Sequence, residues 1–214
     1  MAHVNLRSLR VVLWTVAIIA NIGLAAAFLW VVRTDPPTGT ISSSAEADIR
    51  SMFSLIDHTG RDVTESDYSD QWQLVFFGFT YCPDICPTTL DYVGTTLDLL
   101  GPAAGHVAPL FISVDPERDT AEIMAEYVAA FHPLIIGLTG SPEQIAAVAE
   151  EFKVYYARLE DEAAPDGYLM AHSGYLFLMR PDGSFEAVFR ESGQEPERFA
   201  KEILVRIGEE GNSS

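Results

Sequence analysis

The chain has 214 residues, a formal net charge of −18 at pH 7 and only two cysteines, and 48% of its residues are hydrophobic. This length suits one domain with a substantial core rather than several large ones, and the acidic balance would repel phosphate backbones, so we expect no nucleic-acid partner. The first acidic residue is Asp35, so the acidic surface belongs to the later part of the chain, where it keeps a domain soluble.

An uncharged, apolar run from Val11 to Val32 is the first predicted element. About 20 apolar residues span a bilayer as a helix, whereas the apolar core of a cleaved signal peptide is usually about 7 to 15 residues long. We therefore expect an uncleaved, single-pass anchor over residues 11–32, in contact with membrane lipid. Because Arg7 and Arg10 precede the run, residues 1–10 should stay on the cytoplasmic or matrix side of the inner membrane. The globular part would then lie in the periplasm or the mitochondrial intermembrane space.

The segment after the predicted anchor is rich in Pro, Ser, Thr and Gly and has no apolar periodicity. This composition is typical of a flexible linker, which we assign to residues 33–48. The predicted globular domain covers residues 49–208, and residues 209–214 are expected to form a disordered tail.

Short apolar runs alternate with amphipathic helical patterns along the predicted domain. Continuous apolar runs are typical of strands that are buried on both faces of a sheet. A hairpin is predicted before them, and two strands around a Pro-Asp-Gly turn and a last helix are predicted after them. This order describes an α/β fold in which helices flank a mixed β-sheet. The predicted central strands are residues 73–79, 108–114 and 134–138, and the helical patterns between and after them are residues 88–100, 120–131 and 141–152. Ser141 is the predicted N-cap of the last of these helices. The first hairpin is predicted at residues 53–64, the last two strands at 175–190 and the last helix at 195–210.

Both cysteines lie in the segment TYCPDICPTTL, in which three residues separate Cys82 from Cys86. Cys82 follows the first central strand directly, at the carboxyl edge of the sheet, where open α/β folds bind their ligands. Because Pro87 has no N–H to donate, we expect the regular helix to begin near Pro87 and residues 82–86 to form an irregular turn over its N-terminus. That position favours the thiolate, which both attacks disulfides and binds metals.

The residues alone leave three uses of the cysteine pair open: metal ligands, a redox disulfide, or a structural disulfide. A disulfide requires Cα atoms about 4.4 to 6.8 Å apart, which a non-helical turn permits. Thiolate sulfur is a soft ligand suited to Cu(I), and one added imidazole gives a set that can also hold Cu(II). Structural zinc normally takes four protein ligands, and the chain has no further cysteine, so zinc is the weaker candidate.

Five histidines are candidates for an additional ligand. His3 precedes the predicted anchor and would lie on the wrong side of the membrane. His58 and His106 are in predicted turns and are most simply solvated surface residues. His132 precedes a proline at the start of a strand and is expected to have a structural role. His172 lies just before the predicted strand at 175–179, and periodicity alone does not distinguish it as a ligand.

Two aspartates lie close to the same edge of the predicted sheet. Asp115 ends the second central strand, and it could either hydrogen-bond a ligand and shape the site or serve as a turn or N-cap residue. Asp84, between the cysteines, is expected to cap the following helix.

Four blocks of the sequence resemble the Sco copper chaperones of cytochrome c oxidase assembly, also called SenC-type proteins. The block GFTYCPDICPTTL is similar to the family's Cys-Pro-x-x-x-Cys-Pro signature, and FISVDPERDT and FHPLIIGLTG are similar to its second and third blocks. The block VYYARLEDEAAPDGYLMAHSGYLFLMRPDG resembles the segment that carries the family's metal histidine. Many members have Asp immediately before that histidine, whereas this chain has Ala171.

The resemblance implies a thioredoxin-like domain that binds copper, as Cu(I) and Cu(II), through Cys82, Cys86 and His172. It also implies a metallochaperone that receives copper from an upstream donor protein and delivers it to the CuA site of cytochrome c oxidase subunit II or a similar cuproprotein. The alternative is a thiol-disulfide oxidoreductase that uses Cys82 and Cys86 as a redox disulfide to keep the subunit II cysteines reduced. A peroxidase on the same fold is a third reading, which would not need His172. Whether the chain is an enzyme therefore depends on which of these tasks it performs.

Overall fold

The computed structural model describes residues 49–190 and 195–211, together with Trp14, Ile19, Asn21 and Gly23. The chain divides into two units, residues 1–43 and residues 44–214, and the second contains all the strands described below. Within the described part of the chain, none of the helices combines the length and the apolar character that crossing a bilayer requires. The predicted anchor at residues 11–32 lies outside the described residues apart from those four, which are helical.

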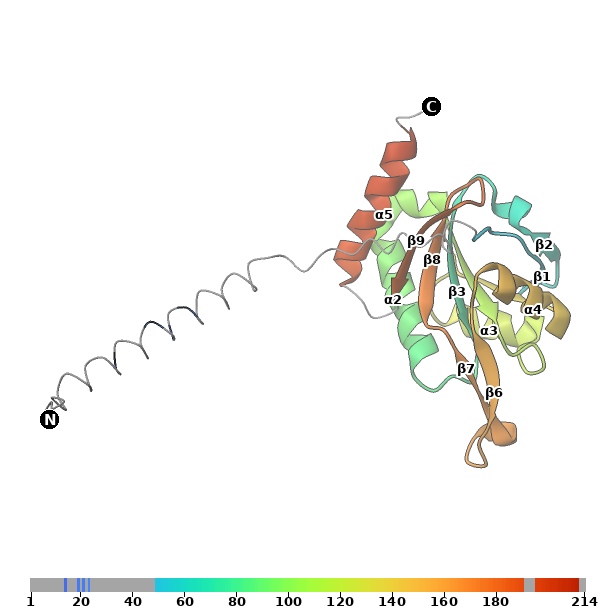
Figure 1. The fold of residues 1–214 in the computed structure, drawn as a ribbon. Coiled ribbons are helices and arrows are strands. Elements are labelled where there is room, and N and C mark those ends of the chain that lie inside the picture. The colour runs from blue at the N-terminus through green and yellow to red at the C-terminus, as the bar shows by residue number, and fades with distance from the viewer. Residues whose placement is uncertain are drawn as a thin grey trace, which may run out of the picture. The chain divides into compact units, whose positions relative to one another are not determined.

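Seven strands form one mixed sheet in the order β2-β1-β5-β4-β3-β8-β9 (Figure 1). Strands β3, β4 and β5 run parallel to one another, while β1 is antiparallel to β5 and β8 is antiparallel to β3. The expected mixed sheet is therefore present. The strands are β1 (Ser54–Asp57), β2 (Asp62–Thr64), β3 (Trp72–Gly78), β4 (Val107–Ser113), β5 (Ile136–Thr139), β8 (Tyr175–Met179) and β9 (Phe185–Arg190).

The two central strands β3 and β4 are buried along their whole length, as their continuous apolar sequences predict. Their side chains point alternately to the two faces of the sheet. Phe76 stacks on Phe111 at 5.9 Å between ring centroids, and Phe111 contacts Tyr127 of the helix α3. On the opposite face, Phe77 meets Phe152, which follows the helix α4, at 5.4 Å. Helices therefore cover both faces of the sheet.

The helices occur where the amphipathic patterns predict them. Thr120 accepts a hydrogen bond from the backbone of Ile123, and Ser141 forms a capping box with Gln144, so both N-caps are made by side chains. Helices α2 and α5 lie side by side (Figure 1). The α-helices are α2 (Ile85–Leu100), α3 (Ala121–Ala129), α4 (Pro142–Glu151) and α5 (Pro196–Gly211), and the 3₁₀ turns are η2 (Glu65–Tyr68), η3 (Gly101–His106) and η4 (Pro165–Gly167).

A second, two-stranded sheet is present that the sequence analysis did not predict. It is an antiparallel hairpin of β6 (Tyr156–Glu160) and β7 (Tyr168–His172), and it extends beyond the seven-stranded sheet (Figure 1). In the register, Tyr156 pairs with His172 at the base of the hairpin, and Glu160 pairs with Tyr168 near its tip. The candidate ligand His172 is therefore the last residue of this hairpin rather than a residue in a connecting loop.

Candidate metal centre

The cysteine segment begins where β3 ends. The backbone N–H of Cys82 donates to the carbonyl of Phe79 at 3.3 Å, which turns the chain toward helix α2. The helix starts at Ile85, so Cys86 is in its first turn, and the expectation of a helix beginning near Pro87 was wrong by two residues. Pro87 is accommodated because the first turn of a helix has N–H groups without intrahelical partners, and a missing N–H there costs nothing.

Glycine at the end of β3 allows the close approach of the buried cysteine. A Cβ atom at Gly78 would lie 2.7 Å from Cys86 Sγ and 2.8 Å from the Phe111 ring. Both distances are shorter than real Cβ contacts, so any larger residue at this position would displace one of these neighbours. The absence of a side chain at Gly78 thus provides the space that the Cys86 sulfur occupies.

The hairpin brings His172 to the same place. Its ring meets the rings of Phe76 and Phe79 edge-on, with centroids 6.0 and 5.9 Å away. Its Nδ1 is 3.3 Å from the carbonyl oxygen of Ser173. Because a carbonyl only accepts hydrogen bonds, this contact requires the proton on Nδ1 and leaves the Nε2 lone pair available. That nitrogen is 3.5 Å from Cys86 Sγ.

The ligand atoms of Cys82, Cys86 and His172 lie within 4.8 Å of one another. Cys86 is fully buried, whereas Cys82 and His172 are partly exposed, and both cysteines are free thiols. Two sulfur atoms and one imidazole nitrogen at this spacing can hold one metal ion, and this soft donor set is suited to copper. The three residues that the sequence analysis selected are therefore brought together.

The two thiols have opposite proton affinities. The Cys86 thiol donates a hydrogen bond to the Cys82 sulfur, and together with the backbone N–H groups of Asp84 and Cys86 it lowers the pKa of Cys82 to about 4, although burial opposes this shift. The Cys86 backbone N–H is 3.4 Å from Cys82 Sγ. The same pairing and its own burial raise the pKa of Cys86. The reduced site at neutral pH thus has one thiolate, Cys82, and one thiol, Cys86.

The other candidate residues lie away from the ligand atoms. Asp115 is buried, accepts a hydrogen bond from Tyr168 Oη at 2.9 Å and pairs with Arg118, so it contacts neighbours of the ligands rather than the ligands themselves. Asp84 occupies the N-cap position of α2, but its side chain makes no capping hydrogen bond. The expected position is thus correct, and the expected bond is absent.

Two further histidines are structural, and one of them was misjudged from the sequence. His58 is partly buried, donates its backbone N–H to the carbonyl of Gly137 at 2.8 Å and accepts from the Gly137 N–H through Nδ1 at 3.1 Å, so it is not a plain surface residue. His132 accepts a hydrogen bond from the Leu134 N–H, in line with the structural role expected for it. His106 is exposed at the end of η3, as predicted. His3 lies outside the described residues.

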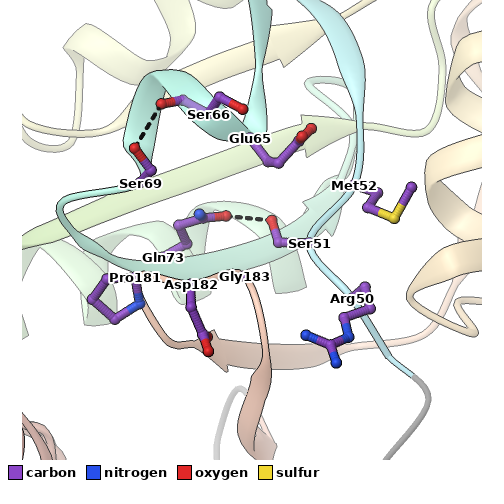
Figure 2. A pocket seen from close by; sticks show the side chains of 10 residues that line it. All are labelled: Arg50, Ser51, Met52, Glu65, Ser66, Ser69, Gln73, Pro181, Asp182 and Gly183. Atoms are coloured by element: carbon purple, nitrogen blue, oxygen red, sulfur yellow. Dashed lines mark hydrogen bonds between the residues drawn. The ribbon is translucent and has the colours of Figure 1, made fainter.

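A separate cavity of about 450 Å³ lies at the opposite end of β3 (Figure 2). Figure 2 shows a hydrogen bond inside it between Ser51 and Gln73, the second residue of β3. Because β3 separates Gln73 from Gly78, this cavity is not part of the cysteine-histidine cluster. Its lining consists of Arg50, Ser51, Met52, Glu65, Ser66, Ser69, Gln73, Pro181, Asp182 and Gly183.

The SCO1/SenC family model matches residues 41–207 of the chain. The chain belongs to the SCO1/SenC family. The family expected from the four sequence blocks is thereby confirmed.

Among curated relatives, the mitochondrial SCO1 homolog 1 of Arabidopsis thaliana is 46% identical over 144 residues, which cover 67% of this chain and 42% of that protein. The human mitochondrial SCO1 homolog is 41% identical over 147 residues, which cover 68% of this chain and 48% of that protein. The chain thus spans about half the length of the curated SCO1 relatives it matches.

Two solved structures of SCO1/SenC relatives are described as having copper bound. Arabidopsis thaliana ScoI is 41% identical, with a TM-score of 0.70, over 75% of this chain and 99% of that one. Bradyrhizobium japonicum ScoI is 37% identical, with a TM-score of 0.68, over 73% of this chain and 98% of that one. These similarities support the thioredoxin-like α/β fold that the resemblance implies. They also agree with copper as the metal expected from the sequence.

Proposed function

We propose that this chain is a copper metallochaperone that holds Cu(I) or Cu(II) with Cys82, Cys86 and His172 and delivers it to the CuA site of cytochrome c oxidase subunit II or a similar cuproprotein. The observation that carries the proposal is the convergence of two sulfur atoms and one imidazole nitrogen within 4.8 Å. The copper-bound structures of two relatives support the choice of metal. In this proposal copper is the cargo: the chain receives it from an upstream donor protein and passes it to the partner.

The exposure of the site suits the release of a metal. Three protein donors leave a coordination position for a ligand from an incoming partner. Exposed apolar side chains surround the ligands: Tyr81 and Ile85, which precede Cys82 and Cys86, are 42% and 46% exposed, and Tyr155, which hydrogen-bonds Ser173 beside His172, is 67% exposed. Exposed aromatic and aliphatic groups around a polar centre are typical of surfaces that bind another protein.

We further propose the domain arrangement that the sequence predicts, with a tail at residues 1–10, a single-pass inner-membrane anchor at 11–32, a linker at 33–48, the copper-binding domain at 49–208 and a tail at 209–214. The support is the apolar run and its preceding arginines. This arrangement places the metal site in the periplasm or the intermembrane space, where it can approach a membrane-bound oxidase.

A thiol-disulfide oxidoreductase is the second candidate, and the pKa of Cys82, about 4, favours it. The Cys82 thiolate would attack a partner disulfide and form a mixed disulfide, releasing the partner's other sulfur as a thiolate. Cys86 would then lose its proton and displace the partner. The partner gains two electrons, and Cys82 and Cys86 become a disulfide.

Substitution of His172 separates the two functions, because dithiol exchange does not require an imidazole ligand. We expect His172→Ala to keep cycling between dithiol and disulfide but to lose about tenfold or more in Cu(II) affinity and to fail in oxidase assembly. The measurement is oxidase activity under low copper in a strain that lacks the gene, with the thiol state recorded alongside. His106→Ala, which removes an exposed histidine, is the matched control.

Full complementation by His172→Ala, together with loss of function in Cys82→Ser and Cys86→Ser, would contradict copper delivery and would identify the chain as a thiol-disulfide reductase. Failure of His172→Ala with intact thiol cycling and a functional His106→Ala supports copper delivery.

A further inference from the structure

We propose that the loop Asp115–Asp119, between β4 and α3, holds the cysteine segment and the histidine hairpin in register, with Arg118 as its central positioning residue. This inference rests on the metal site of the proposed function and assigns residues that act through it. None of the side chains in this loop lies among the candidate ligand atoms. The loop nevertheless contacts both segments that carry them.

On the cysteine side, the contact is made by Asp119, which is fully buried. Its carboxylate accepts two hydrogen bonds from Thr80, one from the backbone N–H at 3.1 Å and one from Oγ1 at 2.6 Å. It also accepts a hydrogen bond from Ser113 Oγ, at the end of β4. Because Thr80 precedes Cys82 by two residues, these bonds fix the path of the chain into the cysteine turn.

On the hairpin side, the contact is made by Tyr168, which is 4% exposed. The Arg118 guanidinium lies 3.7 Å from the centre of the Tyr168 ring, and Arg118 Nη1 donates to the Tyr168 carbonyl at 3.3 Å. The Tyr168 hydroxyl donates to Asp115 Oδ1, and Asp115 Oδ2 accepts from Arg118 Nε. Arg158 of β6 covers the other face of the ring at 3.7 Å. Tyr168 is thus held between a loop arginine and a hairpin arginine.

Arg118 joins the two sides directly. The same guanidinium lies 4.6 Å from the centre of the Tyr81 ring, and Tyr81 immediately precedes Cys82. A cation that contacts two aromatic faces while hydrogen-bonded to a buried carboxylate has little freedom to move. Its position therefore couples the start of the cysteine turn to strand β7.

Strand geometry carries this constraint to His172. Tyr168 and His172 are four residues apart in β7, so their side chains are on the same face of the hairpin. Among the described strands, β6 and β7 pair only with each other, so no ladder hydrogen bond to the seven-stranded sheet fixes the hairpin. Its placement over the cysteines depends on side-chain contacts, of which the Tyr168 cluster is one and the packing of His172 on Phe76 and Phe79 is another.

The test is a double-mutant cycle between Arg118 and His172 in the full chain. Arg118→Gln removes the guanidinium and keeps a polar side chain. We expect Cu(II) affinity to fall about tenfold or more in the wild-type background and less than twofold in the His172→Ala background. Arg118 sets the position of the imidazole relative to the cysteines, and that relation no longer affects copper binding once the imidazole is removed. Arg206→Gln is the matched control, since Arg206 also pairs with carboxylates and contacts a ring, but in α5. It should leave copper affinity unchanged in both backgrounds.

A second measurement needs no copper. Amide hydrogen exchange in β6 and β7 should accelerate in copper-free Arg118→Gln and not in Arg206→Gln. Equal losses of Cu(II) affinity in both backgrounds, or unchanged affinity together with unchanged hairpin exchange, would overturn the positioning role. If the wild-type chain binds no copper, the proposed function is wrong. The hydrogen-exchange measurement on the copper-free chain still decides whether the loop holds the hairpin.

Tyr168→Phe keeps the test decisive if Arg118→Gln does not fold, because it removes one hydroxyl and retains the ring between the two arginines. Faster hairpin exchange, with a loss of Cu(II) affinity that disappears in the His172→Ala background, supports the proposal. Unchanged exchange and unchanged Cu(II) affinity in Tyr168→Phe would contradict it. Tyr92→Phe, in α2 where the ring stacks on Phe199 of α5, controls for loss of a hydroxyl and should change neither measurement.

Discussion

At the scale of single residues, the asymmetry between Cys82 and Cys86 determines the chemistry of the site. Cys82 is partly exposed and accepts hydrogen bonds, whereas Cys86 is fully buried and donates one. A metal that binds both sulfurs must displace the proton of Cys86, while Cys82 is already deprotonated at neutral pH. The exposed sulfur is also the one that an incoming disulfide or metal donor can reach.

This asymmetry predicts the pH dependence of alkylation. The iodoacetamide reactivity of Cys82 should remain high down to about pH 5 and fall through the pKa of about 4, because protonation removes the nucleophile. In Cys86→Ala, the largest cause of the shift is lost, and the midpoint should move upward toward the ordinary thiol value of 9.0. The measurement is the rate of alkylation at Cys82 as a function of pH, read by mass spectrometry.

Cys82→Ser is the control for this experiment, since the remaining buried thiol should react slowly across the same range. A wild-type midpoint between about pH 8 and 9 would refute the thiolate assignment.

At the scale of elements, the β1–β2 hairpin depends on one buried carboxylate. Asp57 is 2% exposed and accepts hydrogen bonds from the backbone and side chain of both Thr59 and Arg61, at 2.6 to 3.0 Å. Burial opposes ionisation, but these bonds outweigh it and lower the pKa of Asp57 to about 2. The carboxylate therefore closes the turn between the two strands.

Because the pKa of Asp57 is lower in the folded state than its ordinary value of 3.8, its stabilisation is fully present above pH 3.8 and is lost as the pH falls through about 2. We expect Asp57→Ala to lower the free energy of unfolding at pH 7 by about 1–3 kcal/mol and to weaken the loss of stability between pH 4 and 2. Urea denaturation at several pH values measures both effects. Asp62→Ala, at an exposed position in the same hairpin, should change neither; an unaltered acid profile in Asp57→Ala would disprove the assignment.

Elements buried on both sides could be predicted from the sequence, whereas the hairpin that carries His172 could not. Strands β3 and β4 are continuous apolar runs, and the sequence placed them within one residue. Strand β6, by contrast, has exposed residues at Arg158, Leu159 and Glu160 and no clear alternation, because one sheet of two strands buries little surface. Because the hairpin was not predicted, the periodicity of the sequence provided no reason to place His172 near the cysteines. Only the family resemblance selected this residue.

The positioning residues were missed for a similar reason. The block FISVDPERDT was identified, but only Asp115 was singled out in it, because its place at a strand end is visible in the sequence. The roles of Arg118 and Asp119 depend on Tyr168 and Thr80, which are distant in sequence. The connection from Asp115 to Asp119 contains four charged residues, and no pattern in it distinguishes Arg118 and Asp119 from Glu117.

At the scale of the whole molecule, the proposed topology places an acidic domain outside the membrane. The apolar run at residues 11–32 and the arginines before it predict that the domain faces the periplasm or the intermembrane space. Protease added outside intact spheroplasts or mitoplasts should therefore digest the domain. Its complete protection until the membrane is permeabilised would rule out this topology.

A Cu(I) titration of the reduced full chain decides whether one copper ion binds to the cysteine-histidine cluster. With a competing chelator present, we expect one Cu(I) per chain and the loss of both free thiols on loading. Cys82→Ser and Cys86→Ser should each abolish this binding, because Cu(I) prefers soft ligands and the cluster contains only two sulfur atoms, so neither can be lost. Undiminished binding of one Cu(I) by either single variant would show that Cys82 and Cys86 are not the copper ligands.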